Sequence, residues 1–361
     1  MRTHTSFLWW TWAPPLAALA LAAAKQADLF HVEGAATWGF VAVLLLGSVF
    51  AAVHHAETIA AKVGQPLGAG VLALAVTVIE TSLIIASMMS SGVRETALAR
   101  DTVFATVLIV LNGVVGLCLL VGGWRHHEQG FRVEGASSAL SVLATLAIVT
   151  LVLPNFTITK LGPQYSPTQL FFVGALSLIL YLVFVFVQSW RHRDYFVAEA
   201  RNESEEEPPS AGATGLSAVL LVGALVAVVL LAKALSQPLE RAILAAGLPA
   251  SLLGVVIAAI VLLPESGAAL RAAYENRVQT SLNLALGSAV ATIGLTVPLV
   301  VAVSLYLGLE LILGLDYEGM ALLLLTLAVS SLTLATGRAT ILQGAVHLVI
   351  FGVFLLLAAV P

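Results

Sequence analysis

The chain has 361 residues, of which 60% are hydrophobic and 10% are charged, and its mean hydropathy is +1.01. Soluble domains carry about 25% charged residues, so this composition excludes an ordinary soluble protein and predicts an all-α protein that crosses a membrane several times. The net charge of −4, without a basic stripe, gives no indication of nucleic-acid binding. The single cysteine, Cys118, excludes an intrachain disulfide and a cysteine metal cluster.

Eleven apolar runs are long enough to predict transmembrane helices. They lie near residues 7–24, 37–56, 67–92, 102–123, 136–154, 168–190, 213–235, 247–271, 281–308, 319–336 and 340–360. The first run also has features of a signal peptide, because Arg2 precedes it and small residues end it. Its tryptophans and the pair Pro14 and Pro15 fit a signal peptide poorly, so we count this run as the first span.

A charge-dense segment, EARNESEEEPPSAGATG, separates the sixth span from the seventh. Its composition predicts a solvated linker, and the alternative is a run of glutamates that attracts calcium weakly. One leading helix followed by five and five spans is typical of membrane proteins built from two inverted repeats. We therefore predict a leading transmembrane helix at 1–36, a first repeat at 37–198, an acidic cytoplasmic linker at 199–212 and a second repeat at 213–361.

The lysines and arginines predict the orientation of the chain. If the N-terminus is cytoplasmic, ten of the sixteen fall on the inside of the membrane and six on the outside. The positive-inside rule therefore favours a cytoplasmic N-terminus, a cytoplasmic linker and an outer C-terminus.

Two carboxylates interrupt the apolar spans. Glu80 is the one ionisable residue of LGAGVLALAVTVIETSLIIASMMSSGV and lies at its middle, and Glu265 lies within VLLPESGAAL. Each belongs to the second span of its repeat. A carboxylate at the centre of a bilayer costs at least a few kcal/mol, so two at matching places favour a functional site. The alternative for each residue is a protonated, hydrogen-bonded glutamate with a structural role.

The residue before Glu265 is Pro264, which cannot donate a backbone hydrogen bond. A carboxylate beside a freed carbonyl oxygen is an environment suited to calcium, sodium or a proton. Arg271 follows only six residues later, about 9 Å along a helix. Either its side chain reaches back to the membrane surface, or the helix is broken and the site lies in a water-filled vestibule.

Polar residues on the spans could complete a cation site. The candidate accessory ligands are Thr77, Asn112, Asn283, Ser288 and Thr292. Glycine and serine residues at four- and seven-residue spacing on these spans also serve helix packing. For Asn112 we favour a ligand, because an amide at this depth needs a polar partner.

His54, His55 and Glu57 lie at the predicted cytoplasmic end of the second span. We favour a solvated helix end, or a pH-sensitive gate formed by His54 and Glu57, because histidine titrates near neutral pH. A zinc site is the alternative, but it would need further ligands such as His126, His127 and Glu128.

Three stretches resemble the calcium/cation antiporter superfamily, and within it the bacterial ChaA-type calcium(sodium)/proton antiporters. HHAETIAAKVGQPLGAGVLALAVTVIETSLI is similar to the first repeat motif of that family, and GGWRHHEQGF to the turn that follows it. LPESGAALRAAYENRVQTSLNLALGSAVATIGLTVPLV is similar to the second repeat motif. The related vacuolar exchangers carry Gly-Asn-x-x-Glu at both repeats, whereas this chain keeps both acids and lacks the Gly-Asn pair.

The resemblance implies two inverted five-helix repeats after a leading helix, in a bacterial inner membrane. It implies that Glu80 and Glu265 bind a transported cation and protons alternately, so that calcium or sodium leaves the cell as protons enter, with potassium as a further candidate cation. The expected partners are these ions and membrane lipid, with no bound cofactor.

Two other classes of protein would also explain intramembrane carboxylates. A cation channel using the same two acids is the main alternative, although channels are built around a symmetric ring or filter and these two sites are unlike each other. An intramembrane enzyme is disfavoured, because the sequence contains neither an HExxH nor a GxSxG motif.

Overall fold

The computed structural model describes residues 8–26, 34–64, 67–90, 95–196 and 209–360. Within these ranges ten helices are long and apolar enough to cross a membrane, which confirms the predicted all-α polytopic class. They are α2 (Ala35–Val63), α3 (Leu67–Ser90), α4 with α5 (Leu98–Leu108 and Val115–His126), α6 (Val133–Ala147) with the helical turns that extend it to Phe156, α7 (Pro167–Phe186) with the turn that extends it to Arg191, α8 (Ala211–Ala245), α9 (Leu252–Tyr274), α10 with α11 (Val278–Ala291 and Val297–Leu307), α12 (Tyr317–Ala335) and α13 (Ile341–Ala359).

The leading helix, α1 (Ala13–Gln26), is shorter than the span predicted at 7–24. Its 14 residues extend about 21 Å, less than the ~30 Å of a hydrocarbon core. The cause lies in Pro14 and Pro15, which are tolerated in the first turn of a helix and not further inside it. The residues just before α1 form a separate 3₁₀ turn, Trp9–Thr11. Most of the predicted linker, including its run of glutamates, lies outside the described residues.

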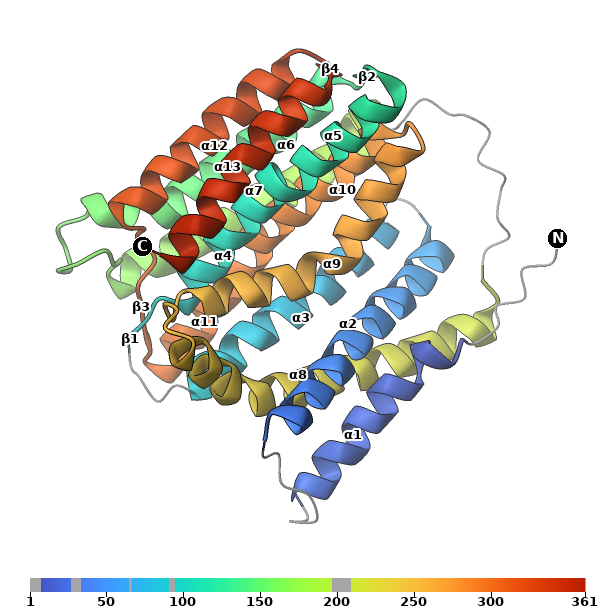
Figure 1. Ribbon diagram of the computed structural model, residues 1–361, viewed down its shortest axis with the longest axis vertical. Helices are drawn as coiled ribbons and strands as arrows, with labels where there is room; N and C mark the ends of the chain where they lie inside the picture. The colour runs from blue at the N-terminus through green and yellow to red at the C-terminus, as the bar shows by residue number, and fades with distance from the viewer. Residues whose placement is uncertain (1–7, 27–33, 65–66, 91–94, 197–208, 361) are drawn as a thin grey trace. The chain divides into compact units, whose positions relative to one another are not determined.

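The helices form two compact units, and the first contains α1, α2, α3 and α8. Within it α8 runs against α1, α2 and α3, as Figure 1 shows. Buried polar contacts tie these helices together. The His55 ring lies 2.9 Å from the Thr11 carbonyl oxygen and 3.3 Å from the Ser217 hydroxyl, and the Ser87 and Ser236 hydroxyls lie 2.8 Å apart.

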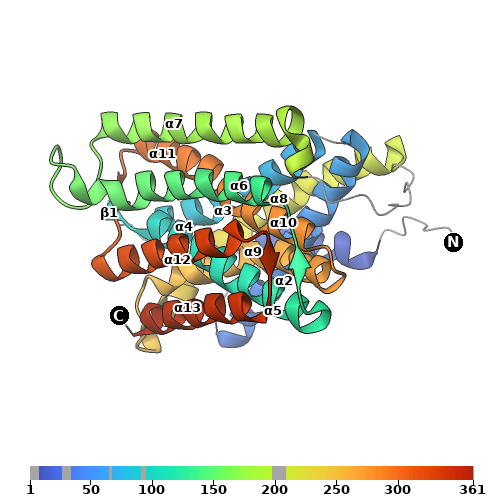
Figure 2. The same ribbon diagram turned by 90° about the horizontal axis from the view of Figure 1, so that it is seen from above.

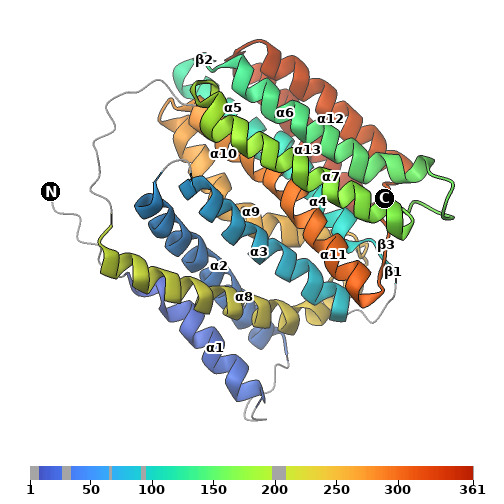
Figure 3. The ribbon, with the colours of Figure 1, turned by 180° about the vertical axis from the view of Figure 1, so that it is seen from behind.

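The second unit contains α4 to α7 and α9 to α13. Two of its spans are continuous helices with a π-helical turn at mid-length: Ile109–Val114 joins α4 to α5, and Thr292–Thr296 joins α10 to α11. We call these segments the first and second π-turn. Figure 3 shows α10 and α11 following one another, with α7 beside α11. The first π-turn packs against α10, and the second packs against α4.

Two short strand pairs join the loops of this second unit. β1 (Glu95–Thr96) pairs in parallel with β3 (Glu310–Leu311), and β2 (Gln129–Gly130) pairs antiparallel with β4 (Arg338–Ala339). Figure 2 shows the unit from above, with α7 lying along α6 and α11. The strand pairs connect segments more than 200 residues apart, and they satisfy backbone groups that would otherwise be unpaired at the helix ends.

The helix that carries Glu265 packs closely on α4. A Cβ atom added at Gly254 of α9 would lie 2.8 Å from the Asp101 carbonyl carbon and from the Thr102 nitrogen. Because these are backbone atoms, no side-chain rotation would relieve the contact, and the two helices would have to separate.

We expect Gly254→Ala to lower the thermal unfolding temperature of the purified protein in detergent, with a cost of about 1–3 kcal/mol from overpacking. Gly267→Ala, on the same helix, is the matched control because its Cβ would meet nothing within 4 Å. The control should leave the unfolding temperature unchanged or raise it, since alanine is the better helix former. Equal unfolding temperatures for the two variants would contradict the close packing of α9 on α4.

Candidate functional site

Glu80 lies within α3 and is buried, with 1% of its surface exposed. Thr77, one turn earlier, is on the same side of the helix, because residues three apart are neighbours on a helical surface. The Thr77 hydroxyl donates a hydrogen bond to the Ala73 carbonyl oxygen at 2.7 Å, and this bond fixes its direction. The Thr77 oxygen keeps a lone pair, and a carboxylate and a hydroxyl oxygen thus lie within one turn of each other on α3.

The same side of α3 is attached to α8. Ser87, seven residues after Glu80, shares its hydroxyl hydrogen bond with Ser236, which itself donates to the Ala232 carbonyl oxygen at 2.9 Å. A serine pair of this kind bonds two spans at a depth where lipid offers no partner. The position of Glu80 therefore depends on how α3 packs on α8.

Glu265 is half-buried in α9, which continues as a helix through Pro264. Pro264 has no N–H, so the carbonyl of Ile260 lacks the hydrogen bond that it would receive in an unbroken ladder. A freed carbonyl oxygen and a carboxylate thus lie on adjacent turns of one helix. The same combination of hard oxygens is found in protein sites for calcium and sodium.

The structure decides between the two interpretations of Arg271. α9 is not broken, and the exposed Arg271 side chain pairs with Glu275 at 3.0 Å just beyond the helix. Hydrogen bonds from Arg271 and Arg277 hold the pKa of the exposed Glu275 carboxyl below its usual value. The broken-helix alternative was wrong, because Pro264 removes one hydrogen bond and the rest of the ladder keeps the helix intact.

Asn112 is fully buried in the first π-turn and has two side-chain partners. Its amide nitrogen donates to the Thr326 hydroxyl at 2.8 Å, and its amide oxygen lies 3.0 Å from Nδ1 of His347. Nε2 of His347 lies 3.2 Å from the Thr333 hydroxyl. This network joins the π-turn to α12 and α13. The sequence interpretation missed His347, although a lone ionisable residue in the last apolar run is the same signal that singled out Glu80.

The remaining candidate ligands lie on α10 and the second π-turn. The Asn283 amide oxygen accepts a hydrogen bond from Gln279 at 3.0 Å, and its nitrogen donates to the Phe196 carbonyl oxygen. Asn283 is therefore engaged in holding a loop end to α10. Ser288 is half-buried, and Thr292 is buried at the start of the second π-turn. A π-turn in a helix often marks a functional position, so Thr292 and Asn112 occupy comparable places in their two spans.

The predicted gate residues lie on one face of α2 within the first unit. His54 is half-buried, with its ring 5.2 Å from the ring of Trp10, and Glu57 is exposed. Over the residues that the structure describes, no group of three or more His, Cys, Asp or Glu side chains is arranged to hold a metal ion. The zinc alternative therefore has no support there, and His126 instead contacts the Tyr274 carbonyl oxygen at 3.0 Å.

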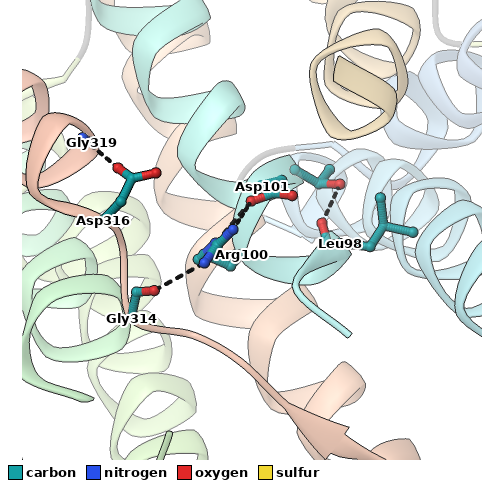
Figure 4. A network of polar contacts seen from close by, with 7 residues as sticks. Leu98, Arg100, Asp101, Gly314, Asp316 and Gly319 are labelled. Carbon is teal, nitrogen blue, oxygen red and sulfur yellow. Dashed lines mark hydrogen bonds and ion pairs between the residues drawn. The ribbon is translucent and has the colours of Figure 1, made fainter. Parts of the chain in front are cut away.

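A second polar network, which the sequence interpretation did not identify, lies at the start of α4. Figure 4 shows the Arg100 side chain between Asp101 and Gly314. Both Nε and Nη2 of Arg100 lie 2.8 Å from Oδ1 of Asp101, and Nη1 donates to the Gly314 carbonyl oxygen at 3.2 Å. Asp316 caps α12 by accepting from the Gly319 nitrogen at 2.7 Å. These contacts fix the start of α4 against the loop before α12.

Known proteins resemble this chain over most of its length. A family model for sodium/calcium exchanger proteins matches residues 35–190 and 216–360. The y4hA protein of Sinorhizobium fredii (strain NBRC 101917 / NGR234) is 50% identical over 98% of this chain and 96% of its own length. The sodium-potassium/proton antiporter ChaA of Escherichia coli (strain K12) is 34% identical over 86% of each chain.

The fold also matches solved structures. Native YfkE aligns with a TM-score of 0.74 at 16% identity, over 97% of this chain and 99% of YfkE. The H⁺/Ca²⁺ exchanger CAX aligns with a TM-score of 0.65 at 17% identity, over 95% and 87% of the two chains. At such identities the agreement concerns the fold alone, and the family follows from the sequence matches. The chain belongs to the sodium/calcium exchanger protein family, as its resemblance to the calcium/cation antiporters predicted.

Proposed function

We propose that this protein is a secondary transporter that exports a cation in exchange for protons, with calcium or sodium as cargo and potassium as a further candidate. The observation that carries the proposal is Glu80, a carboxylate buried inside an apolar spanning helix of a chain that belongs to an exchanger family. One relative is a sodium-potassium/proton antiporter and another, in Bacillus subtilis (strain 168), is a Ca²⁺/H⁺ antiporter. The channel alternative is not favoured, because these relatives are antiporters.

In the proposed mechanism Glu80 and Glu265 are the two carboxylates that bind the transported ions. Each carboxylate holds either a proton or a share of a cation, so occupancy by one excludes the other and couples the two fluxes. Thr77 and the freed Ile260 carbonyl add hard oxygens within one or two turns of these acids. Thr292 and Ser288 are further candidate ligands, and His54 with Glu57 is the candidate gate. Asn112 and Asn283 would have to exchange present hydrogen bonds for a cation.

The repeat organisation supports equivalent roles for the two carboxylates. The family match falls into two segments, 35–190 and 216–360, which nearly coincide with the proposed repeats at 37–198 and 213–361. Each repeat has a π-turn in its third span, at Asn112 and at Thr292. Inverted repeats bring corresponding helices together at the middle of the membrane, where transporters of this plan bind their substrates.

The protein is a multi-pass membrane protein, and we place it in a bacterial inner membrane because close relatives are bacterial transport proteins. The cytoplasmic N-terminus and outer C-terminus remain predictions that require α1 to cross. Reporter fusions at the C-terminus test them directly.

We expect Glu80→Gln and Glu265→Gln each to reduce calcium- or sodium-dependent proton movement in everted vesicles to the background of empty vesicles. Glutamine keeps the shape of glutamate and can neither ionise nor carry the exchanged proton, and burial of an amide costs less than burial of a charge, so both variants should fold. Glu134→Gln, an exposed site on α6, is the matched control and should exchange like the unmodified protein. Substantial exchange by the double Gln variant would overturn the proposed mechanism.

Aspartate substitutions test whether the two acids bind the same ion. Glu80→Asp and Glu265→Asp keep the charge and withdraw it by one methylene, so each should raise the apparent KM for the cation by roughly tenfold while some exchange persists. If both acids hold one cation, the effects of the two changes on KM will not be additive in the double variant, because groups that share a partner are coupled. Strict additivity would indicate two independent sites.

A further inference from the structure

His347 is a buried imidazole that the exchange mechanism does not use. It lies on α13 with 1% of its surface exposed, in a span with no other titratable side chain. Both of its ring nitrogens have partners, Nδ1 with Asn112 and Nε2 with Thr333. These two hydrogen bonds fix the imidazole beside Asn112, a candidate cation ligand. The question is what a buried histidine contributes at this place.

The hydrogen bonds define the role of each atom in this network. The Asn112 amide nitrogen can only donate, and it does so to the Thr326 hydroxyl. The amide oxygen can only accept, so Nδ1 of His347 carries the hydrogen that lies between them. In a neutral imidazole Nε2 is then an acceptor, and the Thr333 hydroxyl donates to it. A neutral His347 with hydrogen on Nδ1 satisfies every polar atom of this contact.

Close packing leaves His347 little freedom to move. A Cβ atom at Gly116 of α5 would lie 2.9 Å from Cβ of His347, and one at Gly344 of α13 would lie 2.8 Å from the Gly116 carbonyl oxygen. The backbones of α5 and α13 therefore meet without intervening side chains. The imidazole is fixed by its backbone as well as by its two hydrogen bonds.

The network bears on the exchange site through the first π-turn. Asn112 is the fourth residue of Ile109–Val114, and this segment packs against α9, the helix of Glu265, as well as against α10, α12 and α13. A π-turn interrupts the regular hydrogen-bond ladder of a helix, so its shape depends on contacts outside the helix. The two bonds of the Asn112 amide, to α12 and to α13, are such contacts.

We propose that His347 is a positioning residue for cation exchange: by donating from Nδ1 to the Asn112 amide oxygen it holds the first π-turn in the shape that packs on α9. It acts as a fixed hydrogen-bond donor and does not carry the exchanged proton. This inference rests on the proposed function, because its consequence is read in the apparent affinity for the transported cation.

Three substitutions separate the two sides of the ring. His347→Asn places an amide N–H where Nδ1 lies and keeps the donor to Asn112, while it gives up the contact to Thr333. His347→Gln extends its amide towards Thr333 and loses the donor to Asn112. His347→Leu removes both contacts and leaves the Asn112 oxygen buried without a donor. Thr333→Val is the matched control, since it removes only the Nε2 partner.

The measurement is calcium- or sodium-driven proton movement in everted vesicles, with KM and maximal rate normalised to folded protein. We expect the Leu and Gln variants to raise KM roughly tenfold, the effect of one lost hydrogen bond between buried groups, with maximal rates within about twofold. The Asn variant and Thr333→Val should retain KM within about threefold of the unmodified protein, with an unchanged pH profile. Asn112→Ala combined with His347→Leu should be no worse than Asn112→Ala alone.

The outcomes distinguish this inference from the proposed function. No exchange by the unmodified protein would remove the proposed function and the inference with it. Exchange with an unaltered KM in folded His347→Leu would remove the inference alone. A displaced pH profile or full loss of exchange in His347→Asn would also overturn it, because the imidazole proton itself would then be required. If the Leu variant does not fold, the contrast between the Asn and Gln variants gives the decision.

Discussion

Polar groups in this protein lie where water does not reach, and this constraint governs the arrangement of its helices. In the hydrocarbon region each polar atom must find a partner within the protein, at a cost of several kcal/mol if it does not. His347, Asn112 and Thr326 satisfy one another by hydrogen bonds, and so do Ser87 and Ser236. Each polar side chain thus determines which helices adjoin, and a transporter can keep acids at membrane depth only inside such a framework.

Buried polar groups find hydrogen-bond partners within each of the two units. In the first unit, polar contacts between the described helices include those of His55 and of the Ser87–Ser236 pair. In the second unit the ties are longer networks reinforced by backbone contacts, such as that between Gly254 and Asp101. Apolar packing is non-directional, whereas hydrogen bonds fix orientation. The helices around Glu265 and the first π-turn are accordingly held in orientation by hydrogen bonds as well as by apolar packing.

Hydropathy alone predicted the spanning helices, because a run of about 20 apolar residues has few other uses. The two acids could also be found, since a lone carboxylate in such a run is conspicuous. The short α1 and the unbroken α9 were predicted less well: both depend on how a helix accommodates proline, at its first turn in one case and in its interior in the other. Asn112 was singled out, but its bond to His347, 235 residues away, has no signature in a single sequence.

Pro264 has a consequence for how ion preference can change. The residue withholds an N–H from α9 without breaking the helix, so the Ile260 carbonyl keeps a lone pair that an alanine at 264 would engage. A residue without charge therefore decides whether the Ile260 carbonyl is hydrogen-bonded within α9. Calcium takes six to eight oxygen ligands, and a proton needs only one acceptor. If Glu265 binds the cation as proposed, a substitution at position 264 changes the preference between calcium and protons while both glutamates stay in place.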